Sequence, residues 1–147
     1  MGVSYLKVSA DDAYQILDDL IVAGCKERDL ITQSYRPFLL APNSVPSADL
    51  DLWEEQAKGW CIRAINELEK IFISQSEPYE FRDANPPFGA TAANIRYFMA
   101  ISKMKARIDK LIEFRNTIRD RFDVHLEVVL GNKIEQIGSD NSVEINP

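Results

Sequence analysis

The chain has few of the residues that build disulfide frameworks and zinc sites. Its 147 residues include two cysteines, Cys25 and Cys61, and a single histidine, His125. Each cysteine lies inside a helical pattern with no second pair and no histidine nearby, so neither a disulfide framework nor a zinc site is expected and a reducing cytoplasm is the expected location. No uncharged apolar run approaches the ~20 residues of a membrane-spanning helix, and no signal segment opens the sequence.

The sequence also lacks the short motifs of the common catalytic sites. There is no GxGxxG, no Walker loop, no HExxH and no GxSxG, so phosphate cradling, zinc hydrolysis and a nucleophile elbow have no local support. The aspartate pairs at 11–12 and 18–19 lie on a predicted helix, where adjacent side chains point about 100° apart and do not converge on a metal. No cofactor and no metal are therefore expected.

The charge is acidic overall but unevenly distributed. A net charge of −6 argues against a general nucleic-acid binder, whereas residues 91–125 carry eight basic residues against four carboxylates. Four of these basic residues fall on one helical face: Arg96, Lys103, Arg107 and Lys110. Two interpretations are open, a patch that binds phosphate or another anion and a solvated face paired with carboxylates of the preceding helix. Those carboxylates are Glu54, Glu55, Glu67 and Glu69.

The apolar residues predict a bundle of long helices. Ser9 is a plausible N-cap for a helix over about residues 10–31, and a second helix has apolar residues at helical spacing from Trp53 to Phe72. A third helix is predicted from about Thr91 to Phe122, with Ile95, Met99 and Met104 among its inward residues. Proline-rich connections are predicted over 33–49 and 74–89. In the first, Tyr35, Phe38, Leu39 and Leu40 are expected to pack across the bundle.

After Asp123 the pattern changes from helical to alternating. LEVVL, KIEQI and SVEIN are short β-prone runs separated by the turn-forming segments Gly131-Asn132 and 138–141. We therefore predict a mainly α protein with a helical domain over 1–123 and a β-prone tail over 124–147. The domain is a three-helix bundle, or a four-helix bundle if residues 35–42 add a turn, and the tail forms a short C-terminal β hairpin or meander.

The tail carries a resemblance to a known family. Gln136-Ile137-Gly138, then Asn141 and Ile145, resemble the core of the RIP homotypic interaction motif and of similar bacterial amyloid signalling motifs. The resemblance implies strands that stack in register between copies. In such a stack the alternating β-branched residues would form a dry face, and Asn132 and Asn141 would form amide ladders. The sequence departs from the pattern at Glu135 and Ser142, where the family favours an aliphatic and an aromatic residue.

Two further resemblances concern the helical part. Trp53, the helix ending at Leu68–Phe72, residues 76–81 and the long third helix are similar to the N-terminal helical domains of bacterial abortive-infection proteins. Arg119 and His125 resemble the R-x4–6-H signature of the HEPN superfamily, whose metal-independent ribonucleases are helical bundles. In that reading the arginine and histidine act on the scissile phosphate; the alternative is a basic helix C-terminus that complements the dipole.

The function expected from these patterns is a non-catalytic protein–protein interaction or adaptor module in bacterial or phage defence. Self-association is expected through a set of tail residues: Ile134, Gln136, Ile137, Gly138, Asn141, Val143 and Ile145. The alternative for the tail is a small sheet that folds against the helices or serves domain-swapped dimerisation, with no signalling role. The expected partner is a protein, most simply another copy of this chain. A HEPN-like ribonuclease using Arg119 and His125 is the alternative, and membrane disruption by the bundle is a third interpretation.

Overall fold

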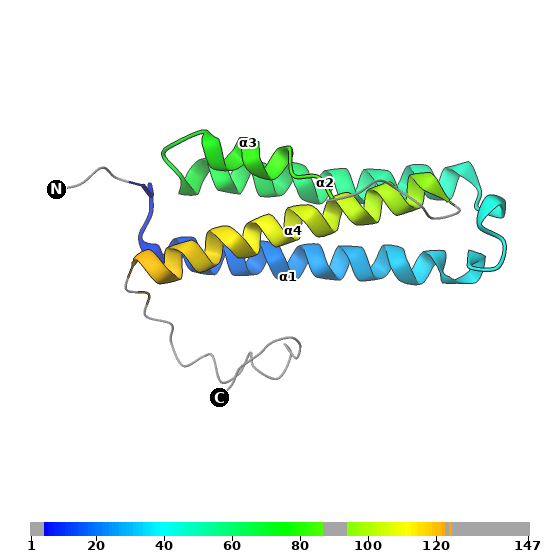
Figure 1. The fold of residues 1–147 in the computed structure, drawn as a ribbon, viewed down its shortest axis with the longest axis horizontal. Helices are drawn as coiled ribbons and strands as arrows, with labels where there is room; N and C mark the ends of the chain where they lie inside the picture. The colour runs from blue at the N-terminus through cyan, green and yellow to red at the C-terminus, as the bar shows by residue number, and fades with distance from the viewer. Residues whose placement is uncertain (1–4, 87–93, 123, 125–147) are drawn as a thin grey trace, which may run out of the picture.

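The chain folds into a bundle of three long helices and one short one (Figure 1). The computed structural model describes residues 5–86, 94–122 and 124. Its long helices are α1 (Ala10–Tyr35), α2 (Ser47–Ile71) and α4 (Ile95–Arg121). The short helix is α3 (Ser76–Arg82), and two 3-10 turns, η1 (Arg36–Phe38) and η2 (Pro42–Ser44), join α1 to α2. The predicted mainly α bundle is confirmed in its four-helix form.

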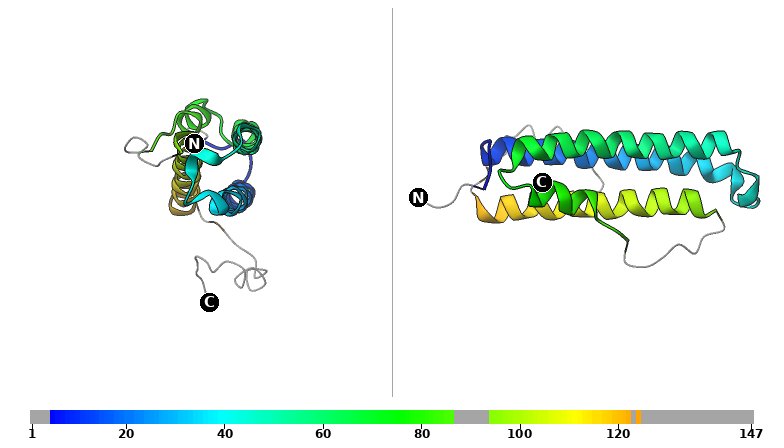
Figure 2. Two further views of the ribbon diagram at one scale, coloured as in Figure 1. Left: turned by 90° about the vertical axis from the view of Figure 1, so that its right-hand side faces the viewer. Right: turned by 90° about the horizontal axis from the view of Figure 1, so that it is seen from above.

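The long helices lie side by side, and α3 packs over α2 and α4 (Figures 1 and 2). The chain runs along α1, returns along α2, and runs along α4 in the same direction as α2. The turns η1 and η2 close one end of the bundle, whereas the end of α4 lies beside the start of α1 at the other end. None of the helices in the described part combines the length and the apolar character that crossing a bilayer requires.

Side-chain caps fix the first residues of two of the long helices. The Ser9 side chain accepts a hydrogen bond from the backbone N–H of Asp12 at 3.0 Å, which confirms the predicted N-cap of α1. Asn94 caps α4 in the same way, accepting from the N–H of Tyr97 at 3.0 Å. The Asn94 amide also donates to the Pro42 carbonyl at 2.9 Å and so ties the start of α4 to η2.

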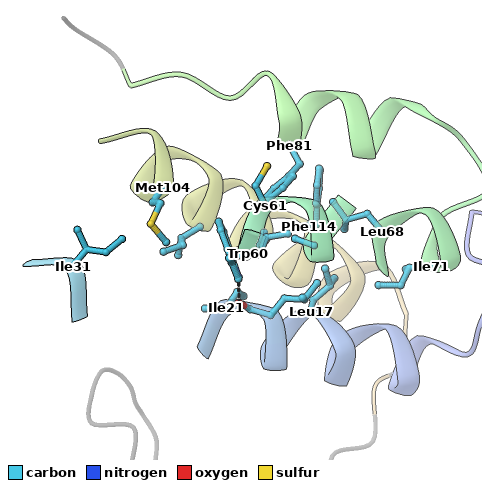
Figure 3. Close-up of a cluster of buried hydrophobic side chains, with 14 of the residues drawn as sticks. Leu17, Ile21, Ile31, Trp60, Cys61, Leu68, Ile71, Phe81, Met104 and Phe114 are labelled. Carbon is cyan, nitrogen blue, oxygen red and sulfur yellow. Dashed lines mark hydrogen bonds between the residues drawn. The ribbon is translucent and has the colours of Figure 1, made fainter. Parts of the chain in front are cut away.

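Trp60 is the centre of the core (Figure 3). Its side chain is fully buried, and its Nε1–H donates to the Leu20 carbonyl of α1 at 3.0 Å. A Cβ placed on Gly24 would lie 2.5 Å from Trp60 Cζ2, so a glycine is needed for α1 to approach the indole this closely. On its other side Trp60 meets Phe81 of α3 edge to face, with ring centroids 5.6 Å apart.

The structure corrects several details of the predicted helices. Residues 35–42 add the one-turn 3-10 helix η1, but the fourth α-helix lies at 76–82, inside a segment predicted as a connection. The start of α2 at Ser47 falls inside the other predicted connection. Near the start of α4 the residues that pack against the core are Tyr97 and Ile101, so Ile95 and Met99 are exposed although both were predicted to face inward, whereas Met104 is buried as predicted.

The connection between α1 and α2 packs only in part. Tyr35 is buried and Phe38 packs against the core, as predicted. Leu39 and Leu40 were predicted to pack as well, but Leu40 is 99% exposed and Leu39 is also exposed, because η1 ends at Phe38 and the chain turns outward before η2.

The predicted tail elements lie outside the described residues. This applies to the hairpin or meander and to the strand residues 134–145.

Candidate functional site

The seam between α2 and α4 is covered along only part of its length. Helix α3 has 7 residues, so it is about 10 Å long at 1.5 Å per residue, whereas α2 with 25 residues is about 38 Å long. The end of α3 lies at Arg107, whose Nη2 donates to the Arg82 carbonyl at 2.7 Å. Towards the start of α4 from this point, the seam contains a groove of about 220 Å³.

The groove has an apolar floor and a charged rim. The floor is formed by Ala57 and Cys61 of α2 and by Ala100 and Met104 of α4. The rim is formed by four charged side chains: Glu54, Lys58, Lys103 and Arg107. Such a surface suits a ligand that combines an apolar part with negative charge, because the floor removes apolar surface from water and the cations interact with anionic groups.

The cations of the rim differ in how far they are already paired. Within the described part of the chain no carboxylate lies within 4.0 Å of the Lys58 or Lys103 ammonium group. Arg107 uses one nitrogen on the Arg82 carbonyl, while its buried Nε has no hydrogen-bond partner. Glu54 is engaged by Arg96 at 2.6 Å, so the four rim residues leave three cations available to an outside anion.

The structure divides the predicted basic patch of Arg96, Lys103, Arg107 and Lys110. Arg96 binds Glu54 and also Asp51, at 2.7 Å, which matches the interpretation as a paired face at this one position. Lys110 binds Glu113 at 2.8 Å and lines a separate hollow of about 310 Å³. Lys103 and Arg107 therefore share the groove between α2 and α4, and Arg96 and Lys110 do not line it.

The other carboxylates proposed to pair with the patch do not contact it. Glu67 pairs with Lys70 on its own helix at 3.3 Å, and Glu54 is the one of the four that binds a patch residue in the described chain. Lys58 was not predicted from the sequence. It lies three positions before Cys61 on α2 and lines the groove together with Lys103, which the residue spacing within one helix cannot show.

The Cys61 thiol is not set up as a nucleophile. Burial raises the pKa of this thiol, and the nearby charges of Arg107 and Lys103 oppose the shift without reversing it. With its side chain 6% exposed and its thiol protonated near neutral pH, Cys61 acts as an apolar floor residue.

The residues of the ribonuclease interpretation are not brought together in the described part. Arg119 lies in the last turn of α4, where its Nε donates to Asp120 at 3.2 Å and its side chain is exposed. His125 lies outside the described residues. The pairing of Arg119 with His125 therefore stays a prediction.

A cluster of aromatic rings fixes the end of α4 from which the tail continues. Tyr5 stacks on Phe122 with centroids 6.1 Å apart and meets Phe72 edge to face at 5.2 Å. The Arg121 guanidinium lies 4.5 Å from the Tyr5 ring centroid. Burial, followed by the charge of Glu77, raises the pKa of the Tyr5 hydroxyl, so the ring stays neutral at physiological pH. Tyr5 thus connects the N-terminal segment to the end of α4.

A few further findings limit what the site can hold. Within residues 5–86, 94–122 and 124, no group of three or more His, Cys, Asp or Glu side chains is placed to hold a metal ion. Asp18, one of the paired aspartates, binds Arg115 of α4 at 2.6 Å.

No protein-family model, no curated protein and no solved structure matches this chain. The site is therefore interpreted from its own geometry.

Proposed function

We propose that this chain is a non-catalytic protein–protein interaction module that self-associates through its C-terminal strand residues, in bacterial or phage defence signalling. The associating residues are Ile134, Gln136, Ile137, Gly138, Asn141, Val143 and Ile145. The link to defence signalling rests on the sequence resemblances alone.

The observation that carries the proposal is that the helical body packs a core of its own. Among the described residues, the buried hydrophobic side chains extend from Ala13 to Ile118 and form one cluster. The last backbone hydrogen bond of α4 joins the N–H of Phe122 to the Ile118 carbonyl. A body that already buries its apolar surface leaves the alternating apolar residues of 134–145 to pair with other strands, since an isolated hairpin is marginally stable in water.

The described body offers little support for catalysis. The two hollows described above measure about 220 and 310 Å³, at or below the lower end of the ~300–1,000 Å³ of ordinary ligand pockets. No buried polar or charged residue lies among the described residues. A catalytic acid or base is commonly a partly buried group with a pKa moved towards neutrality. In the groove, burial moves the pKa of Cys61 upward, away from neutrality.

The test is to place a charge in the tail and, as a control, in the body. Ile137→Asp puts a carboxylate on the apolar face of the proposed strands, whereas Leu40→Asp puts the same charge on a residue that is already fully exposed. We expect the full chain to form dye-binding assemblies, Ile137→Asp to slow assembly by more than about tenfold, equivalent to ~1.4 kcal/mol, and Leu40→Asp to behave as wild type.

Two results would contradict the proposal. One is an Ile137→Asp chain that assembles as fast as wild type, and the other is loss of assembly in Leu40→Asp with assembly intact in Ile137→Asp, which would place the interface at the α1–α2 connection. The ribonuclease interpretation has a test of its own: the chain should cleave RNA, and His125→Ala should abolish that cleavage.

A further inference from the structure

The residues that line the open half of the α2–α4 seam indicate which kind of ligand would bind there. Its floor of Ala57, Cys61, Ala100 and Met104 accepts apolar side chains, and Lys58, Lys103 and Arg107 surround that floor with positive charge. The volume of about 220 Å³ exceeds the ~150 Å³ that holds a benzene molecule, so it accommodates one or two aliphatic side chains and not a large ligand. An acidic peptide with branched apolar residues fits both conditions.

Beyond the described residues, the segment 134–145 has this composition. We propose that the groove between α2 and α4 docks residues 134–145 of the same chain, so that the strand residues are held on the body when they are not paired with other copies. This inference rests on the proposed function, since it concerns the segment through which self-association is proposed.

Charge complementarity favours this occupant. Residues 126–147 carry four carboxylates and one lysine. The carboxylates of Glu135 and Glu144 are each adjacent to apolar residues, namely Ile134 and the pair Val143 and Ile145. Such a segment places aliphatic side chains on the floor while its carboxylates meet the three cations of the rim. Two of those cations, Lys58 and Lys103, have no carboxylate within 4.0 Å in the described chain.

The length of the segment allows docking within one molecule. Arg107 precedes Arg121 by 14 positions and Ala100 precedes it by 21, so the groove lies about 21 to 32 Å along α4 from the end of the helix. Ile134 follows Val124 by ten positions, which extend over up to about 33 Å at 3.3 Å per residue. Residues 134–145 therefore reach the groove without unfolding α4, and their attachment gives them a millimolar effective concentration there.

Docking and self-association compete because both use the same apolar side chains. The apparent tendency to associate falls in proportion to the fraction of undocked segments. If nine-tenths of the segments are docked, releasing them raises the concentration of association-competent chains about tenfold. The groove would then regulate the proposed activity.

The test uses methyl NMR of the full chain, labelled on alanine and methionine and kept dilute enough to be monomeric by light scattering. The double variant Val143→Asp, Ile145→Asp is expected to shift the Ala57, Ala100 and Met104 methyl signals, because it removes the apolar contacts made on the floor. The Ala13 methyl is the internal control, since it is buried in the body away from the groove lining. The shifts are expected to be independent of protein concentration.

A charge swap tests the rim. Glu144→Lys is expected to move the groove signals in the same direction, and adding Lys103→Glu is expected to restore them, because the pair regains opposite charges. Lys26→Glu is the matched control, since Lys26 is an exposed lysine of α1 that does not line the groove. The variant Lys58→Glu, Lys103→Glu is expected to assemble about tenfold faster than wild type, and Lys26→Glu at the wild-type rate.

Several results would overturn the inference. Groove signals that do not respond to the tail variants would show that the segment does not dock. Shifts that grow with protein concentration would assign the contact to the tail of a second copy, and rescue by Lys26→Glu would remove the role of the rim. If the chain assembles while the groove signals stay unchanged, this inference fails and the proposed function stands. If the signals respond but assembly is never seen, the proposed function fails and the docking contact stands.

Discussion

The two halves of the α2–α4 seam differ in what covers them. In one half Phe81 of α3 packs on Trp60, and both side chains are fully buried. In the other half α3 has ended, and a groove with small floor residues and three available cations replaces the aromatic contact. The same two helices therefore build core where a third helix covers them and a candidate binding surface where it does not. Substitutions in the covered half are therefore expected mainly to change stability, and substitutions in the open half mainly to change association.

The largest effect is expected from removing the cover. Phe81→Ala deletes a fully buried ring next to Trp60 and leaves a cavity that the helices cannot close, so the free energy of unfolding should fall by about 3–5 kcal/mol. Tyr79→Ala is the matched control on the same helix, because Tyr79 is exposed, and it should cost less than about 1 kcal/mol. Urea unfolding followed by Trp fluorescence measures both. Equal effects of the two variants would mean that α3 does not contribute its Phe81 to the core.

A smaller effect is expected where α1 meets Trp60. In Gly24→Ala the new methyl group would meet Trp60 Cζ2 at 2.5 Å and Cε2 at 2.7 Å, so the helices must separate and stability should fall by about 1–3 kcal/mol. Gly59→Ala is the control, because the nearest atom to its new methyl group is an Arg63 nitrogen at 3.9 Å. Since alanine favours a helix over glycine, Gly59→Ala should stabilise the protein by up to about 1 kcal/mol. Thermal unfolding that ranks the two variants in the opposite order would contradict the packing described.

The smallest effect is expected from the ion pairs at the edge of the open half. The Arg96 hydrogen bonds, ahead of the opposing effect of burial, lower the pKa of Glu54. A lowered carboxyl pKa contributes stability above its unfolded value, near 4.5, and that contribution is lost as the pH falls through the folded value. Both partners are exposed, so Arg96→Gln should cost less than about 1 kcal/mol at neutral pH. The difference from wild type should vanish in acid and shrink in high salt; a difference that grows in acid would be inconsistent with this pairing.

Much of the covered half could be predicted from sequence. A continuous apolar stripe along a long helix indicates which face of that helix is buried. The stripe from Trp53 to Phe72 did so for α2, and Ser9 marked the start of α1. Helix α3 was missed because it is short and contains Pro78 in a segment rich in polar residues. Its stability depends on the Ser74 side chain, which accepts from the N–H of Ser76 at 2.9 Å, and on the contact of Phe81 with Trp60, which lies far away in the sequence.

The open half was less predictable for a related reason. Helical spacing places Arg96, Lys103, Arg107 and Lys110 on one face of α4, but it does not say which carboxylates lie opposite each of them. The structure neutralises Arg96 with Asp51 and Glu54 and leaves Lys103 and Arg107 beside Lys58. A site shared between helices depends on how the two helices are placed along each other, and that placement depends on core contacts such as Trp60 with Gly24.

In the proposed arrangement the helical body is stable by itself, and the residues after it are the ones through which copies associate. Sedimentation velocity of the full chain and of Ile137→Asp, each over a wide range of concentrations, tests this most directly. Wild type is expected to shift from monomer to large assemblies as concentration rises, while Ile137→Asp is expected to remain a folded monomer throughout. A wild-type chain that stays monomeric at every concentration, or an Ile137→Asp chain that assembles in the same way, would contradict it.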